Sequence, residues 1–102
     1  MAKKRTLTVP GRYGEVKGLC EFVAAGAVEA GLDEDAIFQL ELCCDEAATN
    51  IIEHAYGGED RGDIVCTYQV SVDAFTVMLR DNGRPFDPQA VKSRRWWQIF
   101  NR

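Results

Sequence analysis

The stretch CCDEAATNIIEHAYGG, residues 43–58, decides how this 102-residue chain folds. Its alanines, isoleucines and cysteines recur at helical spacing, and Gly57-Gly58 supplies a stop signal, so the stretch predicts the end of an amphipathic helix. Asp33 is the expected N-cap, followed by acidic residues in the first turn, so the helix should run from Asp33 to about Tyr56. Its expected core face consists of Ile37, Leu40, Cys44, Ala47, Ala48, Ile51 and Ala55.

A polar stripe interrupts this mostly apolar helix, because Glu46, Asn50 and His54 recur every four residues and share one side. Two interpretations are open. The stripe is either the solvated edge of an amphipathic helix or a chemical site. In a site, Asn50 would offer a neutral oxygen to a hard cation such as Mg²⁺, and Glu46 would orient or deprotonate a nucleophile. His54 has no recognisable partner, and we expect a structural role for it.

The segments around this helix read as strands and one further helix. Residues 7–9 predict a short edge strand that stops at a Pro-Gly pair, and residues 15–30 show helical spacing with Gly31 as the C-terminal cap. Residues 63–72 and 74–79 have the composition and alternation of strands, joined by a hairpin turn. The expected inward face of the first of these two strands consists of Ile64, Cys66, Tyr68 and Val70.

This order of elements, β-α-α-β-β, predicts an α+β fold: a two-layer sandwich with a mostly antiparallel sheet and helices on one face. We expect a single domain over residues 1–102, in which residues 89–102 form an unusual basic and aromatic tail. Asp87-Pro88 suits the start of a short tail helix that would carry Trp96 and Trp97. These two adjacent tryptophans need cover from the body of the protein or from another chain.

Composition excludes several classes of protein. The net charge of −4 and the pI near 4.9 argue against a nucleic-acid binder. No apolar run approaches the length that spans a bilayer, and no apolar segment follows the basic amino end as in a signal peptide. The four cysteines form no C-x-x-C pair and stand beside a single histidine, so we expect reduced thiols and no zinc site. A cytoplasmic protein without nucleic-acid or membrane partners is the resulting expectation.

The stretch DNGRPFDP, residues 81–88, is a second candidate for chemistry. Asn-Gly pairs favour type I′ hairpin turns, but the prolines that follow remove ladder donors and do not continue a strand. The alternative is a strand end that presents Asp81 to a ligand. Its carboxylate could accept a hydrogen bond from an exocyclic amine, and Gly83 would leave room for a flat ring, as adenine recognition requires.

Together and in this order, DEAATNIIEHAYGG and DNGRPFDP resemble the N-box and the first glycine box of the Bergerat-fold (GHKL) ATPases, the superfamily of histidine-kinase-like ATPase domains. Within it, the chain is most similar to the bacterial anti-sigma factor serine/threonine protein kinases, over about residues 5–88. The resemblance implies the Bergerat fold, with ATP and Mg²⁺ as ligands. Glu46 would be the general base, Asn50 would bind Mg²⁺, Asp81 would bind the adenine amine, and Gly83 would shape the base pocket.

The resemblance also implies partners: a sigma factor that is bound and silenced, an anti-anti-sigma (antagonist) protein that is phosphorylated on serine, and a second copy in a homodimer. The family continues with an ATP lid and a second glycine-rich box, whereas residues 89–102 contain no glycine. We therefore expect the C-terminal part of the fold to be missing. Two functions stay open: an ATP-dependent kinase and anti-sigma regulator, or a catalytically inactive partner-binding or dimerisation module of the same fold.

Overall fold

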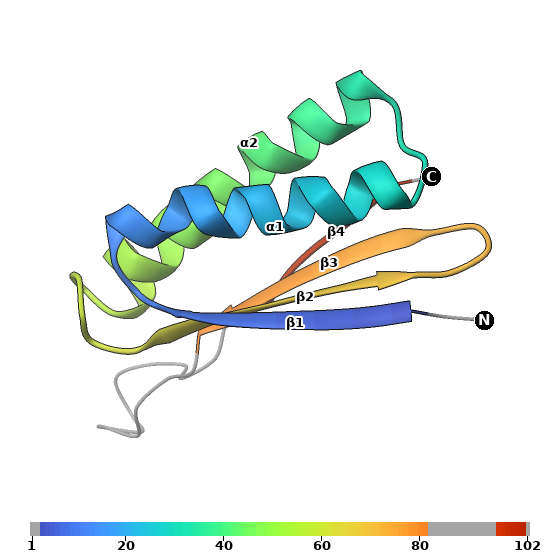
Figure 1. The fold of residues 1–102 in the computed structure, drawn as a ribbon. Coiled ribbons are helices and arrows are strands. Elements are labelled where there is room, and N and C mark those ends of the chain that lie inside the picture. The colour runs from blue at the N-terminus through green and yellow to red at the C-terminus, as the bar shows by residue number, and fades with distance from the viewer. Residues whose placement is uncertain (1–2, 82–95, 102) are drawn as a thin grey trace.

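Two helices lie side by side on one face of a four-stranded antiparallel sheet (Figure 1). The computed structural model describes residues 3–81 and 96–101. It confirms the predicted α+β sandwich with helices on one face of the sheet. The elements in chain order are β1 (Lys3–Pro10), the 3₁₀ turn η1 (Tyr13–Glu15), α1 (Val16–Glu29), α2 (Glu34–Asn50), the π-helical turn η2 (Ile51–Ala55), β2 (Asp63–Val70), β3 (Phe75–Asp81) and β4 (Trp96–Asn101).

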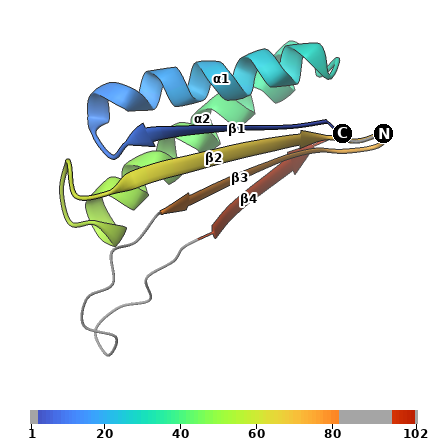
Figure 2. The ribbon, with the colours of Figure 1, turned by 60° about the horizontal axis from the view of Figure 1, so that its bottom comes forward.

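The strands follow one another across the sheet in the order β1-β2-β3-β4, each antiparallel to its neighbour (Figure 2). Their alternation agrees with the predicted strands, since one side of β2 and β3 is buried beneath the helices. The residues on this side are Ile64, Cys66, Tyr68, Phe75, Val77, Leu79 and Asp81. β1 lies at one edge, as predicted, although it is longer than expected because all eight of its residues pair with β2.

Local signals set the end of α1 and the start of α2 where the sequence placed them. Gly31 has a φ of +85° and closes α1 in a Schellman arrangement, in which the Leu32 N–H bonds the Ala27 carbonyl at 3.1 Å. The Asp33 side chain accepts a 2.8 Å hydrogen bond from the Ala36 N–H at the start of α2. The predicted core face is confirmed at Leu40, Cys44, Ala47, Ala48 and Ile51, which are buried, while Ile37 and Ala55 are half-buried.

The last turn of the second helix differs from the sequence prediction of one continuous α-helix. The α-helical part ends at Asn50, and η2 continues as a π turn in which the Tyr56 N–H bonds the Ile51 carbonyl at 2.9 Å. The predicted glycine stop is confirmed, since Gly57 and Gly58 both have positive φ. A π turn contains one more residue than an α turn, so His54 does not continue the stripe of Glu46 and Asn50 with α-helical spacing.

The carboxyl end contradicts one prediction. Residues 96–101 form β4, which pairs with β3 from Arg80 opposite Trp96 to Phe75 opposite Asn101, so the expected helix around Trp96 and Trp97 is wrong. The physical reason is that β3 would otherwise present an open row of N–H and C=O groups, and the sequence WWQIF has a high β propensity. The expected start of that helix, at Asp87-Pro88, lies outside the described residues.

The four cysteines are free thiols in graded environments. Cys43 is exposed, Cys20 is half-buried, and Cys44 and Cys66 are buried. Cys43 and Cys44 differ because they are adjacent on α2 and point to different sides, as expected. The thiols of Cys20 on α1 and Cys66 on β2 both affect the pKa of Cys44, and the Cys20 Sγ donates to the Glu41 carbonyl of α2 at 3.6 Å. In the described ranges, neither helix is long and apolar enough to cross a membrane.

Candidate functional site

Two of the candidate residues lie one turn apart near the end of α2. Glu46 is exposed, and Asn50, the last residue of α2, is half-buried. Side chains at this spacing have Cβ atoms roughly 5–6 Å apart, so one small ligand or ion could contact both. His54 is exposed in η2. The exposure of Glu46 and His54 fits both a solvated helix edge and a site that is open to a ligand.

Asp81 is the last residue of β3 and the buried charged residue of the described part of the chain, with 2% of its surface exposed. It continues the inward side of β3 after Leu79 and pairs in register with Ile64 at the start of β2. Burial of a carboxylate is costly unless polar groups or ions compensate it. Its burial and its place at the end of a strand make Asp81 a candidate binding position.

The fold brings the ends of α2 and β3 to the same end of the molecule. α2 and η2 both contact β3, and the chain passes from η2 through a short connection to β2, whose second residue pairs with Asp81 (Figure 1). Asn50 and Asp81 therefore lie at one end of the sandwich although 31 positions separate them in the sequence. Gly83, the fourth candidate, lies outside the described residues.

A groove of about 380 Å³ lies elsewhere, between the two helices. Its lining residues are Val16, Lys17, Cys20, Phe38, Glu41, Leu42 and Asp45. Glu46, Asn50 and Asp81 are absent from this lining, so the groove is distinct from the candidate site.

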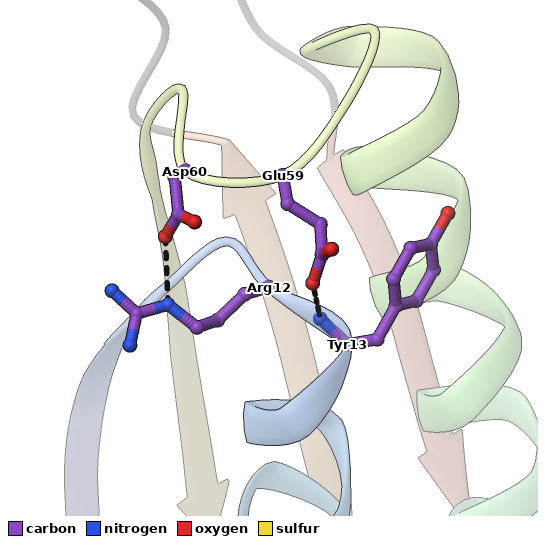
Figure 3. A network of polar contacts seen from close by, with 4 residues as sticks. All are labelled: Arg12, Tyr13, Glu59 and Asp60. Atoms are coloured by element: carbon purple, nitrogen blue, oxygen red, sulfur yellow. Dashed lines mark hydrogen bonds and ion pairs between the residues drawn. The ribbon is translucent and has the colours of Figure 1, made fainter.

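A set of polar contacts joins the start of α1 to the connection between η2 and β2 (Figure 3). The Arg12 Nε donates to Asp60 Oδ1 at 2.7 Å, and the Tyr13 N–H donates to Glu59 Oε1 at 2.9 Å (Figure 3). The Tyr13 hydroxyl also donates to Glu53 Oε2 at 2.8 Å. The hydrogen bond with Asp60 raises the pKa of Arg12, and the hydrogen bond with Glu53 raises the pKa of Tyr13. We call these five residues the polar clamp.

Sequence reasoning missed the polar clamp, because its paired residues are 40 to 48 positions apart. No local pattern signals such pairs. Only the return of the chain from η2 to the end of β1 brings them together, where the Gly11 N–H also bonds the Gly62 carbonyl and the Asp60 N–H bonds the Gly11 carbonyl.

The two-layer sandwich agrees with the class of protein that the two motif stretches predicted, the histidine-kinase-like ATPase domains. Residues 9–96 match the family model described as a histidine kinase-like ATPase domain, and the chain belongs to this family. The resemblance drawn from the two motif stretches is thereby confirmed.

The chain is also similar to curated proteins named serine-protein kinase RsbW. It is 37% identical to the protein of Listeria monocytogenes serotype 4a (strain HCC23) over 93 residues, which cover 90% of this chain and 59% of that protein. It is 32% identical to the protein of Bacillus cereus (strain B4264) over 92 residues, which cover 90% of this chain and 57% of that protein. The chain thus spans less than three fifths of these relatives, in a part that includes both motif stretches.

Proposed function

We propose that this chain binds ATP and Mg²⁺ at the end of the sandwich formed by α2 and β3, and that it is part of an anti-sigma regulatory factor with serine/threonine protein kinase activity. The observation that supports this most strongly is the similarity to serine-protein kinases over 90% of the chain. The buried Asp81 and the polar pair on α2 agree with it, since an adenine-reading carboxylate needs a sheltered position and a metal ligand needs an accessible one.

The residues present suit Mg²⁺ better than a metal that needs a full protein cage. Asn50 is half-exposed and offers a neutral oxygen, and Mg²⁺ takes few protein ligands while keeping several waters. Among the described residues, no group of three or more His, Cys, Asp and Glu is arranged to hold a metal ion, and an ion shared with nucleotide phosphates does not require one. Bound Mg²⁺ would neutralise charge on the phosphates during transfer.

In the proposed reaction, Asp81 accepts a hydrogen bond from the adenine amine, Gly83 leaves space for the base, and Glu46 acts as general base. Glu46 takes the proton of a serine hydroxyl on the anti-anti-sigma partner as that oxygen forms a bond to the γ-phosphorus. The bond between this phosphorus and the bridging oxygen breaks, and ADP leaves. Glu46 is exposed, so a serine on a protein surface can reach it. The same proposal includes binding of a sigma factor by a cytoplasmic homodimer.

A second candidate function is a partner-binding or dimerisation module without kinase activity. Residues 89–102, which directly follow DNGRPFDP, contain no glycine and do not themselves supply a glycine-rich box whose backbone N–H groups could bind phosphates. The backbone of residues 96–101 is paired with β3 as β4. Kinase activity and nucleotide binding are therefore tested separately.

The first experiment is calorimetric titration of ATP into the purified chain, with Mg²⁺ and with a chelator. Asn50→Ala should remove the Mg²⁺-dependent part of ATP binding without unfolding the protein. Asp81→Asn should weaken ATP binding more than GTP binding, because adenine carries a donor amine at position 6 where guanine carries a carbonyl oxygen. Unchanged Mg²⁺ dependence in Asn50→Ala, or equal losses for ATP and GTP in Asp81→Asn, would remove that residue from the proposed site.

Phosphoryl transfer is tested with γ-labelled ATP and a purified anti-anti-sigma protein, alongside a variant of that protein whose acceptor serine is alanine. Kinase activity is supported if the anti-anti-sigma protein with its serine intact becomes labelled and if Glu46→Gln in this chain abolishes that labelling. ATP binding without any label supports the inactive module instead, and capture of the sigma factor in the absence of ATP would give that module its role.

A further inference from the structure

The π-helical turn η2 needs an explanation, because it directly follows Asn50. π turns are rare and occur mostly as single turns at functional sites. Here the Tyr56 N–H reaches back five residues to the Ile51 carbonyl, and the Gly58 N–H bonds the Ile52 carbonyl, both at 2.9 Å. The sequence of this turn contains two adjacent β-branched residues and carries no local signal for π geometry, so contacts from elsewhere must stabilise it.

One such contact is Tyr56 at the end of the turn. Tyr56 is buried, and its hydroxyl donates to the Asp63 carbonyl at 2.5 Å. Gly62 makes room for its ring, since a Cβ there would lie 2.4 Å from the ring, and the backbone at Gly11 also lies close by, since a Cβ there would be 2.7 Å from the Gly62 carbonyl oxygen. The carboxyl end of η2 is therefore held against the ends of β1 and β2.

The other contact comes from the polar clamp. Glu53 is in the middle of η2, and its carboxylate accepts the 2.8 Å hydrogen bond from the Tyr13 hydroxyl. The Tyr13 backbone N–H donates to Glu59, and the neighbouring Arg12 donates to Asp60. The backbone of the tyrosine is therefore held in place independently of the bond from its hydroxyl to η2. Glu53 is three residues after Asn50, in the π turn that directly follows it.

We propose that Tyr13 is a positioning residue that acts through Glu53 to hold the turn after Asn50, and so sets how strongly Mg²⁺ enhances ATP binding. This inference rests on the proposed function, because it assigns Tyr13 a role at the same nucleotide site. Tyr13 touches neither nucleotide nor metal in this account. It reduces the freedom of the Asn50 side chain before Mg²⁺ arrives, which lowers the cost of binding.

The test compares Tyr13→Phe, Glu53→Ala, Glu53→Gln and the double variant Tyr13→Phe/Glu53→Ala by calorimetric titration of ATP with Mg²⁺ and with a chelator. Tyr13→Phe and Glu53→Ala should each reduce the Mg²⁺ enhancement by about two- to ten-fold, the equivalent of one hydrogen bond. The double variant should lose no more than either single variant. Glu53→Gln should behave like the parent, because its amide oxygen still accepts the bond.

Thr6→Val is the matched control, since it also deletes one hydroxyl from one hydrogen bond, the 3.0 Å contact with Thr67 on the sheet face away from the helices. It should leave the Mg²⁺ enhancement unchanged. The positioning role is overturned if Tyr13→Phe leaves the Mg²⁺ enhancement of ATP binding unchanged, or if it weakens ATP binding equally with and without Mg²⁺. The proposed function stands in both cases. A parent protein that binds no ATP refutes the proposed function, and the inference with it.

Amide hydrogen exchange of the unliganded protein gives a readout that needs no nucleotide. Tyr13→Phe should speed exchange at residues 51–56 relative to the parent, whereas Thr6→Val should not. Equal exchange in all three proteins would show that the Tyr13 hydroxyl does not hold η2, which overturns the inference whatever the nucleotide does.

Discussion

Two glycines of α1 should differ in how substitution by alanine changes the free energy of unfolding. Gly18 is exposed, and a Cβ placed there meets no atom within 4 Å. Gly26 is buried, and its Cβ would lie 2.5 to 2.8 Å from three atoms of the Tyr68 ring. That ring cannot easily move aside, because Tyr68 is buried and packs between Phe22 and Phe75 with ring centroids 5.0 and 5.4 Å away.

The expected magnitudes follow from helix propensity and packing. Gly18→Ala should raise the free energy of unfolding by up to about 1 kcal/mol, the gain in a helix interior, because Gly18 lies in the first turn of α1. Gly26→Ala has the same gain, but overpacking against Tyr68 costs about 1–3 kcal/mol. We therefore expect Gly26→Ala to be less stable than Gly18→Ala by about 1–3 kcal/mol, since only the overpacking cost separates the two variants.

Urea unfolding of the parent and both variants measures this difference, provided that the dependence on urea concentration is the same for all three. In a Tyr68→Leu background, Gly26→Ala should cost less, because leucine lacks the ring atoms that a Cβ on Gly26 would meet, and a double-mutant cycle measures the difference. Equal stabilisation by the two alanine substitutions would refute the close packing of α1 on β2 at Gly26.

Three further predictions concern the helix start and the thiols. Asp33→Ala should lower the free energy of unfolding by about 1 kcal/mol, and Asp33→Asn by less, as measured by urea unfolding. Iodoacetamide should label Cys43 in the folded protein, and Cys44 and Cys66 only after unfolding, as mass spectrometry of labelled peptides would show. The hydrogen bond from Cys20 lowers the pKa of Cys44, but the hydrogen bond with Cys66 and burial outweigh it and raise this pKa to about 12 from 9.0. The folded thiol then keeps a proton that the unfolded thiol loses, so its contribution to stability is present below about pH 9 and is lost as the pH rises towards about 12. Cys44→Ala should show a smaller loss over this range, and an identical loss would contradict the buried environment of the thiol.

Local sequence patterns indicated which residues form the candidate site, but not how deeply they are buried. Glu46 and Asn50 were identified from their spacing on one helix, and Asp81 and Gly83 from their place after a strand. Their roles stay predictions, although the family to which they pointed is confirmed. The burial of Asp81 could not be predicted, because it depends on which side of β3 faces the helices at the end of the sheet.

The sequence by itself determined the two helices, the central strands and the antiparallel two-layer arrangement. These depend on signals within a few residues of one another: the Asp33 cap, the glycines at Gly31 and Gly57, and the alternation in β2 and β3. Only the tertiary structure decided that the tryptophan-containing tail is a strand, because a strand takes its hydrogen bonds from a neighbour and the open edge of β3 provides them. The tertiary structure also decided the polar clamp, and through its Tyr13–Glu53 hydrogen bond one support of the π turn, because the clamp joins residues 40 or more positions apart and no local pattern records such partners.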